Sequence, residues 1–347
     1  MESNRVVVGL LTILCVIAVG VICDAAQAVL VPLIIAWLLS YILAPVVNFL
    51  VDHKVPVGPA TLVVLLLLLG ICYLSGLFIH ERITGFAEEF PKYQGQLQTM
   101  SNDIYLKVNQ RFNLPEEAQF DVNWTKWVYA RLVTISGSFA RFLGNLGLVL
   151  IFLIFMLLGK PYFGCKVQAA FPVGRSRKIT SVISSIARQI GRYLTIKLCV
   201  SLVTGFLVWL SCILIGIDFP VTWGTLAFFL NFIPTVGSVI ASIPPVILAL
   251  VQFYPSYWQA GVAAVCMLSI QQVMGSFIEP KVQGDNLNLS PLVILMALVF
   301  MGWLWGAVGA LLSVPLAVAL KIVCENIDAL QPISIMMGSG KACIKDS

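Results

Sequence analysis

Four side chains that can hydrogen-bond a small polar molecule lie inside apolar sequence in the last third of the chain. Asn231 interrupts one apolar run, and Gln271, Gln272 and Ser276 lie near the end of the next. Polar groups buried among apolar residues are costly unless they have partners, and in transporters such groups commonly face a solute. We therefore expect Asn231, Gln271 and Gln272 to offer hydrogen bonds along a solute path, on which Ser276 also lies.

A carboxylate ends the second of these apolar runs, in Glu279-Pro280-Lys281. An ionisable group at the end of a membrane span is a functional candidate, and Glu279 could carry a proton or coordinate a cation. An anchoring pair of Glu279 with Lys281 at the membrane interface is the alternative. Asp218 is the only charged residue between Leu198 and Ile278, and its position in a short turn favours a structural role.

The run from Trp223 to Leu250 is hydrophobic enough to lie in lipid, but it contains residues that break helices. Proline removes a backbone donor and clashes with the preceding turn, and glycine loosens a helix. Freed carbonyls in hydrocarbon need partners, so such breaks are typical of backbone that is buried in protein or lines a solute cavity. Close helix packing is the alternative reason for these residues. The helix-breaking residues are Pro234, Gly237, Pro244 and Pro245.

A second interrupted run extends from Ser290 to Val323, and its 34 residues exceed the about 20 that one straight crossing needs. The two runs share a weak internal repeat, because Gly237 to Pro244 resembles Gly309 to Pro315 with a spacing that differs by one residue. This pairing favours a translocation path over packing alone. Each run could cross once, kinked, or turn back as a re-entrant hairpin. The interruptions of the second run are Gly302, Gly306, Gly309 and Pro315.

The composition indicates which kind of fold holds these residues. Apolar residues make up 59% of the chain and charged residues 11%, about half the charged share of a soluble domain. So few charges cannot cover a soluble surface, whereas a bilayer removes that need. We expect an all-α polytopic membrane protein with about eight transmembrane segments, some broken or re-entrant. The first five expected spans are residues 6–23, 29–51, 59–79, 142–159 and 198–217, and three more follow Val221.

Charge predicts the orientation of these spans, because Lys and Arg in short loops favour the cytoplasmic side. Residues 160–197 contain eight basic residues and no acidic one, whereas residues 81–141 contain seven of each. We expect the first region in the cytoplasm and the second outside the membrane as a small helical domain. Counting spans from there places both termini in the cytoplasm.

The basic region ends in an amphipathic pattern. Apolar residues recur at a spacing of three and four between Lys178 and Lys197, and basic residues flank them. Such a helix can lie along the cytoplasmic interface, where anionic membrane lipid attracts its Lys and Arg. Packing of this helix against its own protein is the alternative. No recognition motif accompanies the charge, so we expect no nucleic acid partner.

These patterns divide the chain into six parts. The expected parts are a three-span membrane region at 1–80, an extracytoplasmic helical domain at 81–141, a fourth span at 142–159, a basic cytoplasmic segment with the amphipathic helix at 160–197, a C-terminal membrane region with broken helices at 198–323, and a cytoplasmic tail at 324–347.

The residues that usually carry catalysis or bind metals do not form such patterns here. The nine cysteines include no CxxC pair, and the two histidines, His53 and His80, both flank hydrophobic segments. The sequence offers no nucleophile–base pair, no metal-ligand spacing and no paired carboxylates at a membrane face. We expect neither an enzyme nor a bound metal or cofactor.

Three motifs resemble the autoinducer-2 exporter family of bacterial membrane proteins. They are NFIPTVGSVIASIPP, EPKVQGDNLNLSP and GWLWGAVGALLSVPL, and the resemblance extends to the earlier SYILAPVVNFL and FPKYQGQL. The stretch TWGTLAFFLNFIPTVGSVIASIPP is especially similar to the branch that exports the quorum-sensing furanone signal. The residues at matching family positions are Asn231, Pro234, Gly237, Pro244, Glu279, Pro280, Gly284, Pro291, Gly306, Gly309 and Pro315.

The resemblance implies about eight spans, the bacterial inner membrane, transport without ATP hydrolysis, and assembly as a homo-oligomer. It leaves the substrate open, because other branches resemble sodium or lithium/proton antiporters. The leading hypothesis is a secondary transporter or facilitator that exports a small polar solute, with autoinducer-2 as first candidate. A sodium(lithium)/proton antiporter and a non-transporting membrane scaffold are the alternatives. The hypothesis assigns possible ion coupling to Glu279 and the substrate path to Asn231, Pro234, Gly237, Pro244, Gln271, Gln272, Ser276, Gly306, Gly309 and Pro315.

Overall fold

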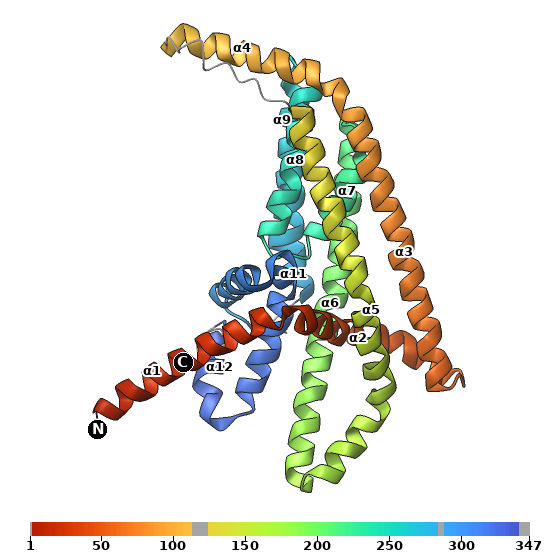
Figure 1. The fold of residues 1–347 in the computed structure, drawn as a ribbon, viewed down its shortest axis with the longest axis vertical. Coiled ribbons are helices and arrows are strands. Elements are labelled where there is room, and N and C mark those ends of the chain that lie inside the picture. Colours follow the sequence, from red (N-terminus) through yellow and green to blue (C-terminus); the bar gives the residue numbers. More distant parts are fainter. Residues whose placement is uncertain (1, 113–123, 284–287, 340–347) are drawn as a thin grey trace. The chain divides into compact units, whose positions relative to one another are not determined.

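The chain folds into helices, most of them long and apolar. The computed structural model describes residues 2–112, 124–283 and 288–339, and in these ranges all regular secondary structure is helical (Figure 1). Among the described residues, six helices are long and apolar enough to cross a membrane, and two shorter apolar ones, α7 (Pro220–Leu230) and α8 (Val236–Gln252), accompany them. The predicted all-α polytopic membrane fold is confirmed. The six long helices are α2 (Gln27–Asp52), α3 (Val57–Glu89), α5 (Trp124–Ala170), α6 (Val173–Ile215), α9 (Trp258–Gln271) with the turns that continue it, and α11 (Pro291–Glu325).

The chain forms two compact units, each built from separate stretches of sequence. Unit 1 contains Met1–Leu67, Asn145–Thr195 and Gln283–Ser347, and unit 2 contains Leu68–Gly144 and Ile196–Val282. Helices α3, α5 and α6 each contribute residues to both units. Several boundaries of the six expected parts therefore fall inside continuous helices: residues 80 and 81 lie in α3, 159 and 160 in α5, and 197 and 198 in α6. The division into six domains stays a prediction.

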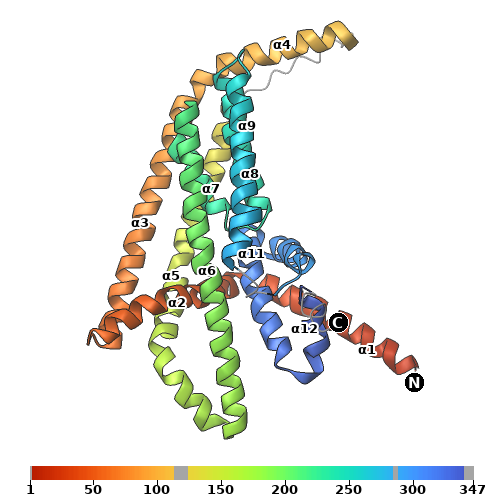
Figure 2. The same cartoon turned by 180° about the vertical axis from the view of Figure 1, so that it is seen from behind.

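Unit 1 is held together by an apolar core that joins α2, α6, α11 and α12 (Gln331–Met337). The helix α1 (Glu2–Ala25) contacts α2 and α11, and the indole nitrogen of Trp305 donates a hydrogen bond to the Cys23 carbonyl at 3.2 Å. Within this unit α5 and α6 meet at a tight turn around Phe171, visible in Figures 1 and 2. A crossing of the membrane by α1 stays a prediction.

Unit 2 has its own apolar core, which joins the ends of α3 and α6 to α7, α8 and α9. The polar segment that follows α3 forms a 3-10 turn, η1 (Phe90–Tyr93), and then α4 (Gln94–Phe112), which contacts α8. This segment was expected to be helical, and its described residues are. Figure 2 shows α7, α8 and α9 side by side in this unit.

The amphipathic pattern at 178–197 belongs to α6 and not to a separate surface helix. Its apolar side chains, among them Ile186, Ile190 and Tyr193, are buried in the core of unit 1. Arg188 and Arg192 are exposed, as the pattern predicts. The structure therefore favours the alternative in which this helix packs against its own protein.

Two glycines set the distance between α6 and α7 in unit 2. A methyl group on Gly205 would lie 2.7 Å from the carbonyl oxygen of Gly224, and a methyl group on Gly224 would lie 2.7 Å from that of Gly205. The two backbones can be this close only without side chains, as in other small-residue helix contacts in membranes.

We predict that Gly205→Ala or Gly224→Ala destabilises the protein by about 1–3 kcal/mol, because the added methyl group forces the helices apart. Thermal unfolding of the purified protein in detergent measures this change. Gly261→Ala is the matched control, since nothing lies within 4 Å of a methyl group at that position in α9. Equal melting temperatures for all three variants would show that the contact does not constrain the fold.

Candidate functional site

The first interrupted run is a hairpin of two short helices and not one kinked span. Helices α7 and α8 have 11 and 17 residues, so each is shorter, at about 16 and 25 Å, than the roughly 30 Å of hydrocarbon. They pack against each other, and the chain reverses between Asn231 and Thr235, with Pro234 in the turn. A methyl group on Gly237 would lie 1.8 Å from the Leu230 carbonyl oxygen, so this reversal needs glycine. The question that the sequence left open is answered in favour of the hairpin.

The second interrupted run also turns back on itself. Helix α11 is broken at Trp305 and Gly306, where Gly306 has φ 62° and ψ −144°, a conformation that favours glycine. A methyl group on Gly309 would lie 1.9 Å from the Met301 carbonyl oxygen. In an uninterrupted helix these two residues would be about 12 Å apart along the axis. The 34-residue run therefore contains two arms joined by a sharp reversal.

The weak sequence repeat is accompanied by the same local geometry in both hairpins. In each, a glycine shortly after the reversal presses against a carbonyl oxygen of the first arm, seven residues back for Gly237 and eight for Gly309. Pro244 and Pro315 then follow in the second arms. The first hairpin belongs to unit 2 and the second to unit 1.

Asn231, at the tip of the first hairpin, is buried and paired. The residue is 5% exposed, and its side-chain amide nitrogen donates a hydrogen bond to the Ser201 hydroxyl of α6 at 3.0 Å. A buried amide of this kind needs a partner, and the hydroxyl supplies one. In this conformation Asn231 is closed off, so a solute would have to replace Ser201.

A second pair of polar side chains joins the hairpin to α9. The Gln271 amide nitrogen donates to the Ser242 hydroxyl of α8 at 3.3 Å, and that hydroxyl donates to the Ser238 carbonyl at 3.0 Å. Asn231 and Gln271 thus use the same arrangement, in which an amide is held by a serine of a neighbouring helix. Gln272 and Ser276, which the sequence grouped with Gln271, are exposed.

Glu279 has a buried partner, but it is not Lys281. The Lys197 ammonium lies 2.6 Å from a Glu279 carboxylate oxygen, and the two side chains are 3% and 17% exposed. Lys281 is exposed and forms no ion pair within the described residues. The expected Glu279–Lys281 anchor is therefore replaced by a pair between α6 and the end of the α9 segment. Breaking a buried pair by removing one partner costs about 3–5 kcal/mol.

Three functional candidates on α6 were missed by the sequence reasoning. Lys197 was predicted only as one of the basic residues of the cytoplasmic segment, and no role was predicted for Ser201 or Thr204. All three are buried, and their spacing of four and three places them on one face of α6, together with Gly205. Polar residues at helical spacing inside an apolar run were the signal that could have revealed this face.

The backbone between Gln271 and Glu279 departs from the α-helix. Residues Gln272–Ile278 form a π-helix, η3, which links α9 to α10 (Glu279–Gln283). π-helical turns are rare and are found frequently at functional sites. Here one such turn lies between the residue that bonds Ser242 and the residue that pairs with Lys197.

The predicted path residues are thus divided between the units. Asn231, Pro234, Gly237, Pro244, Gln271, Gln272, Ser276 and Glu279 belong to unit 2, whereas Gly306, Gly309 and Pro315 belong to unit 1. Unit 2 therefore holds the hydrogen-bonding and charged members, and unit 1 contributes the reversal at Gly306 and Gly309, whereas Pro315 does not interrupt its helix. We take the buried polar groups of unit 2 as the candidate functional site.

Comparison with known proteins agrees with this architecture. The sequence matches the family described as AI-2E family transporter over residues 10–329. The chain belongs to the AI-2E transporter family. It is 30% identical to the AI-2 transport protein TqsA of Escherichia coli over 318 residues, which cover 90% of each chain. It is 34% identical over 316 residues to a Borreliella burgdorferi protein, covering 91% of this chain and 86% of that one, whose name gives transport but no substrate.

Membership of the AI-2E transporter family makes this chain a multi-pass membrane protein that transports and not an enzyme. YhhT of Escherichia coli, 29% identical over 338 residues and covering 94% of this chain and 93% of its own, likewise has a name without a substrate. The names of these three relatives agree on transport, but only the name of TqsA states a substrate.

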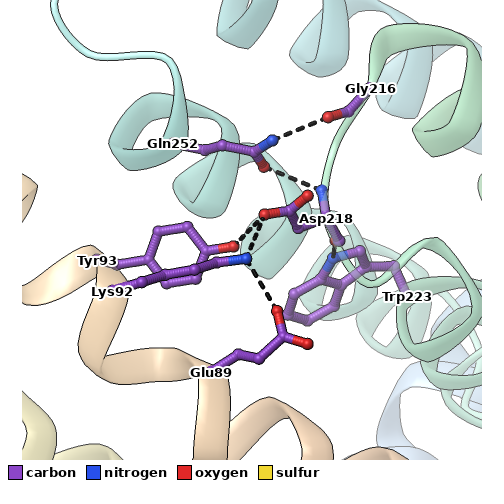
Figure 3. A network of polar contacts seen from close by, with 7 residues as sticks. All are labelled: Glu89, Lys92, Tyr93, Gly216, Asp218, Trp223 and Gln252. Carbon is purple, nitrogen blue, oxygen red and sulfur yellow. Dashed lines mark hydrogen bonds and ion pairs between the residues drawn. The ribbon is translucent and has the colours of Figure 1, made fainter.

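A polar network holds the open end of the first hairpin of this AI-2E transporter (Figure 3). Lys92 forms ion pairs at 2.9 Å with both Glu89 and Asp218, and the Tyr93 hydroxyl donates to the Asp218 carboxylate. The Asp218 amide donates to the Gln252 side chain at 2.9 Å. The network thereby ties η1 to the turn before α7 and to the end of α8, which is the structural role expected for Asp218.

The same network holds the Asp218 carboxylate in its charged form. Burial alone would raise the pKa of Asp218, but hydrogen bonds from Tyr93 and Lys92 outweigh burial and keep the pKa below its ordinary value of 3.8. A carboxylate with a lowered pKa stabilises the fold above its ordinary pKa, and this contribution is lost as the pH falls through the lowered value.

We predict that breaking the buried Lys197–Glu279 pair destabilises the protein. Lys197→Met or Glu279→Gln should each cost about 3 kcal/mol because the remaining group is left buried without its partner. The double variant should be more stable than the sum of the single changes predicts, since neither charge remains. Thermal unfolding in detergent measures the cycle, with Lys281→Gln as the exposed control. Additive losses would mean that the two groups do not interact.

We further predict that Asp218→Asn flattens the acid limb of the stability profile. The wild type should lose melting temperature as the pH falls below about 4, because the Asp218 charge that pairs with Lys92 is titrated. The variant should start lower at neutral pH and lose less on acidification. Melting temperatures measured between pH 3 and 7 test this, and parallel curves for the two proteins would contradict it.

Proposed function

We propose that this transporter exports a small polar solute across the bacterial inner membrane without nucleotide hydrolysis, and that the solute is autoinducer-2. The observation that carries the proposal is the buried amide of Asn231, held by Ser201 at the tip of a hairpin of two short helices. The 30% identity to TqsA, a protein named for AI-2 transport, supports the choice of solute.

The arrangement supports a path in which hydrogen bonds are exchanged. Asn231 and Gln271 each rest on a serine hydroxyl, and a hydroxyl-rich solute presents the same chemistry to an amide. Movement of the hairpin tip away from α6 would release Asn231 from Ser201 without leaving the amide unpaired, provided that solute takes its place. Because one hydrogen bond replaces another, the free-energy barrier to release of Asn231 from Ser201 stays low.

The Lys197–Glu279 pair supports ion coupling at the same site. Protonation of Glu279 would remove the negative charge that holds Lys197. The end of the α9 segment could then move relative to α6. The same pair is the observation that favours a sodium(lithium)/proton antiporter as second candidate. A cation could bind Glu279 only after Lys197 has left, and within the described residues no three acidic, His or Cys side chains gather to hold a metal ion.

Cytoplasmic termini and assembly as a homo-oligomer belong to this proposal as well. They rest on the basic residues at 160–197 and on the family resemblance. A non-transporting scaffold is the remaining alternative, and it needs no exchangeable hydrogen bond at Asn231.

The experiment compares two variants that remove the same hydrogen bond from opposite sides. Asn231→Ala should reduce autoinducer-2 efflux from proteoliposomes about tenfold, because the solute loses one hydrogen bond that holds it on the path. Ser201→Ala should leave efflux near the wild-type rate, since Ser201 only holds the amide while no solute is present. Equal losses in both variants would show that the bond is structural.

The same vesicles separate the alternative functions. Retention of autoinducer-2 by the wild type would overturn the choice of solute. Sodium-driven pH changes that Glu279→Gln abolishes would establish the antiporter instead. Wild-type vesicles without either activity, together with unchanged function of the Asn231→Ala variant in cells, would favour the scaffold.

A further inference from the structure

Unit 1 contains a large cavity that the proposed solute path does not use. It has a volume of about 840 Å³ and lies between α2, the second half of α5 and the first half of α6. Most of its wall is apolar or aromatic. The larger wall residues are Trp37, Tyr41, Phe155, Met156, Phe163 and Ile186.

Three basic residues stand at this otherwise apolar wall. Lys160 and Lys166 come from α5 and Arg188 comes from α6, and all three are exposed. Within the described part of the chain none of them forms an ion pair, and no acidic residue lines the cavity. The Lys160 ammonium lies 5.9 Å from the centre of the Tyr41 ring. The cavity therefore presents three positive charges that have no counterion among the described residues.

The remaining polar groups of the wall suit the acceptor oxygens of a headgroup. Ser40 and Asn48 come from α2, and Thr180 and Ser184 come from α6. The Asn48 amide and the Thr180 hydroxyl can donate to phosphate or glycerol oxygens, whereas the Ser40 and Ser184 hydroxyls already donate to the Trp37 and Ser181 carbonyls at 2.7 and 2.8 Å. Charge and hydrogen-bonding capacity thus occur beside an apolar surface, which is the pattern of an amphiphilic ligand.

We propose that this cavity binds one anionic phospholipid. Its phosphate lies among Lys160, Lys166 and Arg188, and an acyl chain lies along the aromatic wall. The cavity is far larger than a small polar solute requires, and its apolar wall favours hydrocarbon over water. Residues 160–197 are expected in the cytoplasm, where the leaflet carries anionic lipid and basic pockets between membrane helices bind such headgroups.

A phospholipid matches both the basic and the apolar residues of the cavity wall, whereas the other candidate occupants match only one of these groups. A free phosphate would neutralise the basic residues but would leave the aromatic surface around Trp37 and Phe163 in contact with water. A segment of a second copy of the chain would cover the apolar surface, but it would have to bring acidic groups to three cations in a chain with 16 acidic and 21 basic residues. The lipid supplies both parts in one molecule.

The test uses the full-length protein, purified in detergent, stripped of lipid and examined by native mass spectrometry. Palmitoyl-oleoyl phosphatidylglycerol should half-saturate the wild type at a concentration about tenfold below that of the matching phosphatidylcholine. The triple variant K160Q/K166Q/R188Q should lose this preference and bind both lipids alike. The conservative variant K160R/K166R/R188K should keep it, which separates loss of charge from loss of fold.

The matched control is K54Q/R177Q/K281Q, which removes three positive charges from residues outside the cavity. It should bind phosphatidylglycerol as the wild type does. Equal weakening in the control and in the cavity variant would overturn the proposal, since the preference would then reflect overall charge. Displacement of the lipid by inorganic phosphate at equal concentration would assign the cavity to a free anion. Loss of bound lipid on self-association, with recovery on dissociation, would assign it to a second copy.

Discussion

Backbone groups left unpaired at the ends of short apolar helices are the constraint on which the rest of this structure depends. A bilayer offers no water to pair them, so the protein must supply every partner itself. At the first reversal it does so within a few residues. The Leu230 carbonyl accepts from the Ile233 amide at 2.9 Å, and the Ile233 carbonyl accepts from the Gly237 amide at 3.3 Å. The turn is closed by its own backbone, and the missing side chain at Gly237 is what brings the two arms close enough.

The polar residues of unit 2 follow from that closed turn. Once the arms of the hairpin are fixed, the Gly205–Gly224 contact holds α6 against α7 at backbone distance, and Ser201 lies one turn before Gly205 on the same helix face. The hydroxyl can then reach Asn231 at 3.0 Å. Lys197, one further turn back, belongs to the same face. Small residues and polar residues therefore act together, because close packing is what allows short side chains to meet across helices.

Sequence patterns were sufficient for the fold class and for the two reversals, but they also predicted breaks at Pro244, Pro245 and Pro315, which lie inside the helices α8 and α11. Hydropathy separates this chain from soluble proteins, and Pro234, Gly237, Gly306 and Gly309 marked both reversals. Whether a broken run crosses or returns depends on which surfaces the two arms bury, and periodicity within one segment does not contain that information. The pairing of Glu279 with Lys197 joins residues 82 positions apart, so local context pointed to Lys281 instead. Several expected domain boundaries lie inside helices and not at helix ends, since a change of composition does not require a break: α6 continues from a basic amphipathic stretch into an apolar one.

The π-helix adds a geometric link between the two contacts on either side of it. Gln271 bonds Ser242 just before it, and Glu279 pairs with Lys197 just after it. A π-turn holds one residue more than the corresponding α-turn, and one residue of helix corresponds to a rotation of about 100°. Conversion of η3 to α-helix would therefore rotate Glu279 relative to Gln271 by about that angle, and both contacts could not survive the change. The Gln271 amide contact and the Glu279 ion pair thus lie at the two ends of one seven-residue π-helix, and the geometry of that segment holds both in place.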